Sequence, residues 1–208
     1  MKLLTILLIP IIIISCNSSD FMTKNATKDS LSIDSLKVEK VKVKKHNRWD
    51  TLYVALNKDA IVLGDSATGR IDYVLVKFQP LIYFSDFSVD SVYNGIKVPV
   101  DLKSNKIGLQ FKTVITETYK YVGVNFAGHY CLVNWGCGSP CQYFIVVDVL
   151  TGKIYNGVDV ALGLNYKANS RMLIVNPPDS SNYYFDCPYC KPLVYIFDDN
   201  NKKFILRQ

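Results

Sequence analysis

The chain has 208 residues, a formal net charge of +6 and 49% hydrophobic residues. The charge is uneven: residues 24–48 contain eight basic and three acidic side chains (net +5), whereas residues 49–208 contain fifteen basic and fourteen acidic ones (net +1). Because the second segment has no excess charge to form a basic face, the composition argues against nucleic acid as a partner. Its 160 residues are enough for one domain with a substantial core, and a segment of this length is short for two domains.

Residues 1–15 have the pattern of a lipoprotein signal peptide. Lys2 supplies a positive charge, residues 3–14 form an apolar run too short to span a bilayer, and Ser15 precedes Cys16. A cysteine at this place resembles the lipobox of bacterial lipoproteins. The resemblance implies cleavage before Cys16, a diacylglycerol thioether on its sulfur and an acyl chain, such as palmitate, on its amine. Two or more chains on one residue give stable anchoring in a lipid bilayer.

This N-terminus predicts a bacterial cell-envelope location, with the inner or outer membrane leaflet left open. The alternative is an ordinary signal peptide in which Cys16 is incidental. Residues 16–48 then form a polar, lysine-rich segment, and every tyrosine, glycine and tryptophan of the chain lies at or after Trp49. We expect a flexible basic tether here. Residues 37–45 could instead lie against anionic headgroups or join a sheet as an edge strand.

Residues 49–208 are expected to form one globular domain, which begins with short strands. β-type runs separated by turn residues predict strands over residues 51–56, 60–63, 71–78 and 81–84. A single long helix is expected from Asn105 to about Tyr119, with Ser104 as its cap. Gly108 within it costs about 1 kcal/mol relative to alanine, so this helix needs tertiary packing.

The stretch from residue 125 to residue 155 organises the domain. Residues 129–135 and 142–148 have the alternation and β-branched content of two antiparallel strands, joined by a loop rich in glycine and cysteine. Gly152 is expected to supply the positive φ of a second turn, after which a third strand begins at Ile154.

Further strands are predicted near the C-terminus, over residues 172–175, 183–185, 193–197 and 203–206. Short strands joined by turns, with one long helix, indicate a mainly β (α+β) fold. We therefore predict an antiparallel β-meander sheet domain, pinned by disulfides, with the helix across one face.

Four motifs follow one another in this domain: N-F-A-G-H-Y at residues 125–130, W-G-C-G-x-x-C at 135–141, D-x-x-T-G-K at 148–153 and S-R-x-L-x-V at 170–175. With the helix before them, they resemble a family of exported bacterial proteins with no assigned biochemistry. The resemblance covers residues 93 to about 206. It implies an exported fold and carries no catalytic assignment.

Five cysteines follow Cys16. An oxidising compartment favours two local disulfides, Cys137 with Cys141 and Cys187 with Cys190. The same four residues could instead bind zinc if their loops met. The sequence Cys187-Pro-Tyr-Cys190 also resembles the glutaredoxin redox motif, but no helix is expected after it to lower the pKa of the first thiol. Cys131 is expected to be a buried thiol on a strand.

His129 is the only histidine after residue 48, and no catalytic motif accompanies it. We expect a hydrogen-bonded structural histidine, and we take His129, Tyr130 and Trp135 as candidate binding residues. Residues 183–185 with Tyr189 and Trp135 could add an exposed aromatic face for a glycan or a protein. The alternative is that these aromatics simply cover the sheet.

These features favour a non-enzymatic lipoprotein that binds an envelope protein or glycan, without catalytic residues, metal or cofactor. The alternative is a thiol-redox or zinc protein that uses the four paired cysteines.

Overall fold

The computed structural model describes residues 52–56, 58–65, 68 and 70–208 of the chain. The predicted signal peptide, the lipidation site at Cys16 and the tether up to residue 48 lie outside these described residues. The boundary of the domain at residue 49 therefore stays a prediction.

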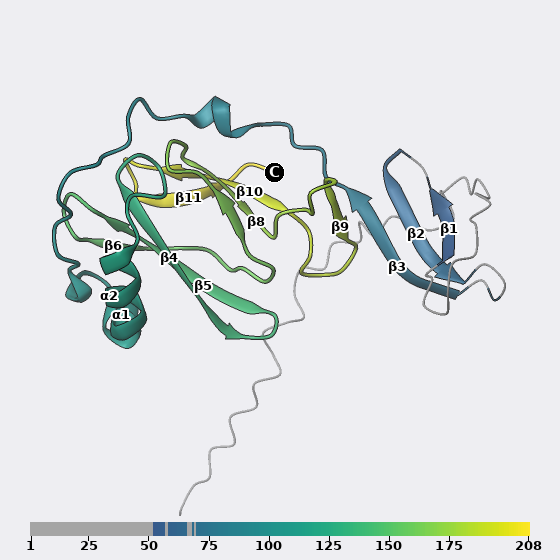
Figure 1. The fold of residues 1–208 in the computed structure, drawn as a ribbon, viewed down its shortest axis with the longest axis horizontal. Coiled ribbons are helices and arrows are strands. Elements are labelled where there is room, and N and C mark those ends of the chain that lie inside the picture. Colours follow the sequence, from purple (N-terminus) through teal and green to yellow (C-terminus); the bar gives the residue numbers. More distant parts are fainter. Residues whose placement is uncertain (1–51, 57, 66–67, 69) are drawn as a thin grey trace, which may run out of the picture. The chain divides into compact units, whose positions relative to one another are not determined.

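The described part is mainly β, as predicted, with eleven strands and two α-helices (Figure 1). In chain order its elements are β1 (Leu52–Leu56), β2 (Ala60–Asp65), β3 (Arg70–Lys77), 3₁₀ turns at Phe84–Phe87 and Leu102–Ser104, α1 (Lys106–Gln110), α2 (Lys112–Tyr121), β4 (Tyr130–Gly138), β5 (Cys141–Asp148), β6 (Ile154–Asn156), β7 (Leu164–Tyr166), β8 (Met172–Val175), β9 (Tyr183–Phe185), β10 (Leu193–Asp198) and β11 (Lys203–Leu206). In this part of the chain, no helix has the length and apolar character needed to cross a membrane.

The strands form three antiparallel sheets, in the orders β1-β2-β3-β9, β4-β5-β6 and β11-β10-β8-β7. The central meander is confirmed: β4 pairs with β5 from Tyr130 opposite Asp148 to Gly138 opposite Cys141, and β5 then pairs with β6. The last hairpin is also confirmed, as β10 and β11. The sequence did not predict the strand β7 or the pairing of β8 with β7 and β10. It also did not predict that β9 leaves its neighbours in sequence and pairs with β3.

The first half of β4 and the second half of β5 are buried on both faces, and successive side chains point to opposite cores. Tyr130 and Leu132 point to a core shared with β8 and β10, whereas Cys131 and Val133 point to a core shared with α2. Two layers therefore cover this part of the hairpin, which explains why residues 130–133 are nearly all apolar. A third core lies on the other side of β8 and β10.

The predicted helix over residues 105–119 is divided in two. Its cap is Asn105, whose Oδ1 accepts a hydrogen bond from the Ile107 N–H at 2.9 Å; Ser104, expected in this role, instead bonds the Asp101 carbonyl at 2.6 Å. At Phe111 the backbone leaves helical geometry (φ −112°, ψ 32°). The Phe111 ring packs against Trp135 with centroids 4.9 Å apart, so a tertiary contact accompanies the break.

The strand predicted over residues 81–84 is wrong. This segment leads into the 3₁₀ turn at Phe84–Phe87, where Asp86 Oδ2 accepts a hydrogen bond from the Tyr83 N–H at 2.8 Å. A short acidic side chain that bonds the backbone three residues earlier favours a turn over an extended strand.

Candidate functional site

The motif at residues 125–130 shapes the backbone that leads into β4. Asn125 acts as a strand partner through its side chain: Oδ1 accepts from the Leu132 N–H at 2.7 Å and Nδ2 donates to the Leu132 carbonyl at 3.0 Å. Ala127 and Gly128 then both adopt positive φ, 46° and 84°. A Cβ at Gly128 would lie 3.0 Å from the Ser91 carbonyl oxygen, so glycine is needed there. This turn presents the next two residues of the motif, His129 and Tyr130.

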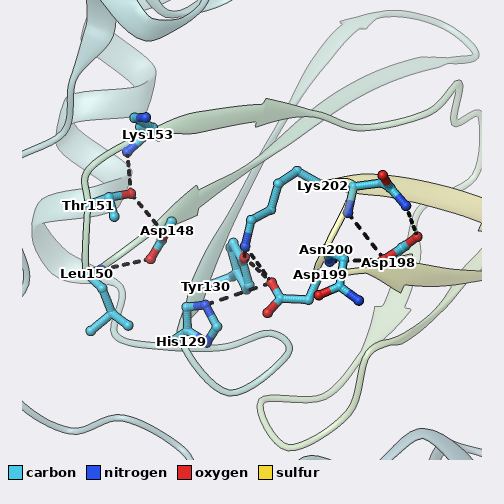
Figure 2. Close-up of polar contacts among 11 residues, drawn as sticks. His129, Tyr130, Asp148, Leu150, Thr151, Lys153, Asp198, Asp199, Asn200 and Lys202 are labelled. Carbon is cyan, nitrogen blue, oxygen red and sulfur yellow. Dashed lines mark hydrogen bonds and ion pairs between the residues drawn. The ribbon is translucent and has the colours of Figure 1, made fainter.

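His129 and Tyr130 belong to a polar cluster with Asp199 and Lys202, which we call the Tyr130 cluster (Figure 2). The Tyr130 hydroxyl donates to Asp199 Oδ1. Lys202 Nζ donates to the Tyr130 hydroxyl oxygen at 2.7 Å and to Asp199 Oδ1 at 2.8 Å. The His129 ring lies over Tyr130 with centroids 4.3 Å apart, and its Nε2 is 3.9 Å from Asp199 Oδ1, too far for a hydrogen bond.

Two groups of this cluster have shifted pKa values. Burial of Tyr130 and its hydrogen bond to Asp199 hold the tyrosine pKa far above its usual range. For Asp199, burial raises the pKa, but hydrogen bonds from Lys202 and Tyr130 outweigh it and leave the pKa below the ordinary value. At neutral pH the tyrosine therefore keeps its proton and the aspartate stays ionised. The cluster fastens the β10–β11 turn to the start of β4.

The D-x-x-T-G-K motif forms a turn that is also drawn in Figure 2. Asp148 accepts hydrogen bonds from the Leu150 N–H at 2.9 Å and from the Thr151 hydroxyl at 2.8 Å. Gly152 has the positive φ that the sequence predicts, 75°, and a Cβ there would lie 2.3 Å from the Pro99 carbonyl oxygen. This carboxylate therefore holds the turn through one backbone and one side-chain hydrogen bond.

The predicted cysteine pairs are both disulfides, with Cα atoms 5.2 Å apart for Cys137–Cys141 and 5.1 Å for Cys187–Cys190. Cys131 is a buried free thiol, as expected, and burial raises its pKa to about 11. Each pair closes its own loop. Within the described residues no three histidine, cysteine or acidic side chains gather into a group that could hold a metal ion.

Trp135 lies apart from the Tyr130 cluster. It belongs to the face of β4 that packs toward α2, where its ring contacts Phe111 and Tyr143. The alternation of β4 places Trp135 on the opposite face from Tyr130. The three candidate binding residues therefore do not converge on one site.

The predicted aromatic surface is only partly exposed. In β9, Phe185 is open to solvent and meets Tyr73 edge to face with centroids 5.8 Å apart, and Tyr189 is also exposed. Tyr184, by contrast, packs against the third core. Trp135 does not extend this surface, since it is half-buried under the helices.

A hollow of about 310 Å³ lies between the end of β3, the β7–β8 pair and two loops. We call it the Phe78 hollow. Its lining combines aromatic, proline and aliphatic side chains with two amides and one carboxylate: Phe78, Pro80, Ile82, Tyr83, Phe84, Asn165, Met172, Ile174, Pro178, Asp179 and Asn182. Concave sites with this mixture are typical of small-ligand binding.

The sequence does not predict the residues that complete the Tyr130 cluster or line the hollow. Asp199 and Lys202 lie in an ordinary turn between two predicted strands. The one signal for them is that a buried tyrosine hydroxyl needs a hydrogen-bond partner. The hollow is built from segments more than 80 residues apart in the chain, so no local pattern marks it.

Comparisons of this chain with family models, curated proteins and solved structures gave no match. The likeness to the exported family therefore stays a prediction.

Proposed function

We propose that this protein is a membrane-anchored lipoprotein of the bacterial envelope whose folded part is a non-enzymatic binding module. The lipobox pattern that ends at Cys16 supports the anchor. Two disulfides in the described part fit an oxidising compartment outside the cytoplasm.

One contrast carries the binding proposal. Side chains that could perform chemistry are tied to one another: Asp199 is held by Tyr130 and Lys202, and both cysteine pairs are oxidised. The Phe78 hollow, in contrast, has an exposed rim with polar and aromatic groups that face a concave space. A protein that binds needs such a surface and needs no activated nucleophile or base.

The thiol-redox alternative has less support. A redox-active cysteine pair usually has its first thiol at a helix N-terminus, which lowers that thiol's pKa. Here Cys190 is followed by β10, which begins at Leu193, and the turn that contains Cys187 is not followed by a helix. The pair is better suited to closing the loop between β9 and β10.

The anchor is tested by expressing the full chain in a bacterium and separating membranes from soluble protein. We expect the natural chain in the membrane fraction and a Cys16→Ser variant in the soluble fraction, because the variant has no sulfur to acylate. Cys131→Ala is the matched control and should stay with the membranes, since its thiol is buried in the fold. Equal membrane retention of the Cys16→Ser variant would contradict the anchor.

The non-enzymatic part needs a separate test. Purified full chain is incubated with envelope polysaccharide and peptide, and the products are analysed by mass spectrometry. We expect the substrates to be recovered intact. Turnover that a His129→Ala substitution abolishes would show that the module is an enzyme and would overturn this part of the proposal.

A further inference from the structure

We propose that the Phe78 hollow binds a neutral saccharide that carries an acetamido group, such as an N-acetylated hexose unit of an envelope glycan. This inference rests on the proposed binding function and names its site and its ligand class. The argument comes from three features of the lining: its floor, its rim and its charge.

The floor of the hollow is apolar. Phe78, Met172 and Ile174 contribute to it and are 8%, 1% and 7% exposed, and all three belong to the third core. Such a floor accepts a methyl group and offers nothing to a hydroxyl. An acetamido substituent ends in a methyl group, so it should pack against this apolar floor more favourably than a sugar hydroxyl does.

The rim carries an exposed aromatic ring. Tyr83 is 59% exposed, and Phe84, which packs against the third core, also lines the hollow. The Lys167 ammonium sits 4.9 Å from the centroid of the Phe84 ring. An exposed ring beside a hollow offers a flat apolar platform on which the C–H face of a sugar ring can pack.

Two amides at the rim are available for hydrogen bonding. The structure gives the side chains of Asn165 and Asn182 no hydrogen-bond partner among the described residues, although both are in the lining. Each amide offers one acceptor oxygen and two donor hydrogens. Sugar hydroxyls and an acetamido group likewise both donate and accept, so they match this pair better than a purely accepting or purely donating ligand.

The charge of the lining selects a neutral ligand. Asp179 is its only charged residue, and Oδ1 of that carboxylate already accepts hydrogen bonds from the N–H groups of Ser181 and Tyr183 at 2.8 and 2.9 Å. The Lys167 ammonium beside the Phe84 ring offsets this charge, so the surroundings of the hollow favour neither an anionic nor a cationic ligand. A bare acyl chain would cover the two amides without giving them hydrogen-bond partners, which is costly.

The test measures binding of the trimer of N-acetylglucosamine to the full chain by calorimetry, in a detergent without a sugar headgroup. We expect binding that a Tyr83→Ala substitution weakens by about tenfold, because the variant has no ring to pack against the sugar. Asn165→Ala should also weaken it. Tyr73→Ala is the matched control: Tyr73 is 55% exposed, lies outside the hollow and should leave the affinity unchanged.

Several results would overturn the inference. The first is that the trimer does not bind at millimolar concentration, and the second is that the Tyr83→Ala variant binds it as tightly as the natural chain does. The third is that an unacetylated glucose trimer binds as tightly as the acetylated one. The fourth is that a proline-rich peptide binds, that the Tyr83→Ala substitution abolishes this binding, and that the sugar trimer does not affect it. In each case a membrane-bound chain would leave the anchor intact. Cleavage of the trimer, seen by mass spectrometry of the recovered sugar, would instead contradict the non-enzymatic function itself.

Discussion

Tyr130 joins the start of the central hairpin to the last one. Its ring is fully buried and meets Phe197 with centroids 4.9 Å apart, while its hydroxyl reaches Asp199 and Lys202. The ring supplies packing and the hydroxyl supplies a charge-assisted hydrogen bond. The two contributions can be separated because phenylalanine keeps the ring.

A Tyr130→Phe substitution should lower the free energy of unfolding at neutral pH by about 1–2 kcal/mol, because Asp199 and Lys202 lose a partner while the core keeps its shape. Urea unfolding measures this change. Tyr143→Phe is the control, since Tyr143 is 44% exposed and its hydroxyl has no hydrogen-bond partner among the described residues. A loss as large in Tyr143→Phe would contradict the role given to the Tyr130 hydroxyl.

The stability difference between the natural chain and the Tyr130→Phe variant should depend on pH. The pKa of Asp199 is lower in the folded protein than its ordinary value, so its ionised form stabilises the fold. That contribution is complete above the unfolded pKa of about 4 and is lost as the pH falls through the lower folded value. The stability difference between the natural chain and the Tyr130→Phe variant should therefore shrink in acid. A difference that grows as the pH falls would contradict this assignment.

Asn176 connects three segments that are separate in sequence. Its Oδ1 accepts hydrogen bonds from the N–H groups of Ala161 and Leu162, at 3.0 and 2.9 Å, and its Nδ2 donates to the Tyr189 carbonyl at 3.0 Å. It is 7% exposed and has φ of 52°, a conformation that asparagine tolerates better than most residues. Through these bonds it holds the Cys187–Cys190 loop in place.

An Asn176→Ala substitution should destabilise the protein by about 2–4 kcal/mol, because it leaves three part-buried backbone groups without partners at a strained position. Thermal or urea unfolding followed by circular dichroism measures the loss. Asn165→Ala, at an exposed position of β7, should change stability by no more than about 0.5 kcal/mol. If the two variants were equally stable, Asn176 would not be the connector described here.

At the scale of elements, most strands were predictable because they have a local pattern, whereas β7, which is three residues long, was not predicted. In β4, β5 and β10, apolar and polar residues alternate or β-branched residues follow one another, and turn-forming residues flank each strand. The turn at Gly152 follows from its residue types. The helix was predictable in place but not in form. Its break at Phe111 accompanies a contact with Trp135, which lies 24 positions later, so helical periodicity alone could not reveal it.

Gly108 in α1 shows how packing can override propensity. Helix propensity alone would favour alanine by about 1 kcal/mol. In the structure, however, a Cβ at Gly108 would lie 2.5 Å from the Leu102 carbonyl oxygen and 2.7 Å from Ile154 Cδ1. This glycine allows α1 to approach the turn before it and β6.

We therefore expect Gly108→Ala to lower the free energy of unfolding by about 1–3 kcal/mol, since the gain in propensity is smaller than the cost of overpacking. Gly123→Ala is the matched control, because a Cβ at Gly123 meets no atom within 4 Å. Differential scanning calorimetry of both variants decides the matter. A Gly108→Ala variant at least as stable as the natural chain would show that α1 shifts at little cost.

At the scale of the whole molecule, the sequence predicts a helix across one face of the sheet but neither the second covered face nor which loops meet. The structure covers one face of β4 and β5 with α2 and the other with β8 and β10. The candidate sites depend on loops that meet across long sequence separations: Tyr130 with Lys202, and Phe78 with Asn182. Residue type and periodicity carry no information about such contacts.

The predicted location in the cell envelope and the two disulfides are both consistent with the hypothesis of an exported, lipid-anchored domain. One measurement tests it most directly: the intact mass of the full chain purified from bacterial membranes, before and after alkylation under native and denaturing conditions. We expect the mass of residues 16–208 with a diacylglycerol and an acyl chain. No thiol should alkylate natively, and one, Cys131, should alkylate after denaturation without reductant.

A mass without lipid would contradict the anchor and leave Cys16 as an ordinary residue. Bound zinc, or Cys187 and Cys190 that alkylate in the native chain, would make the cysteines the functional site in place of the Phe78 hollow.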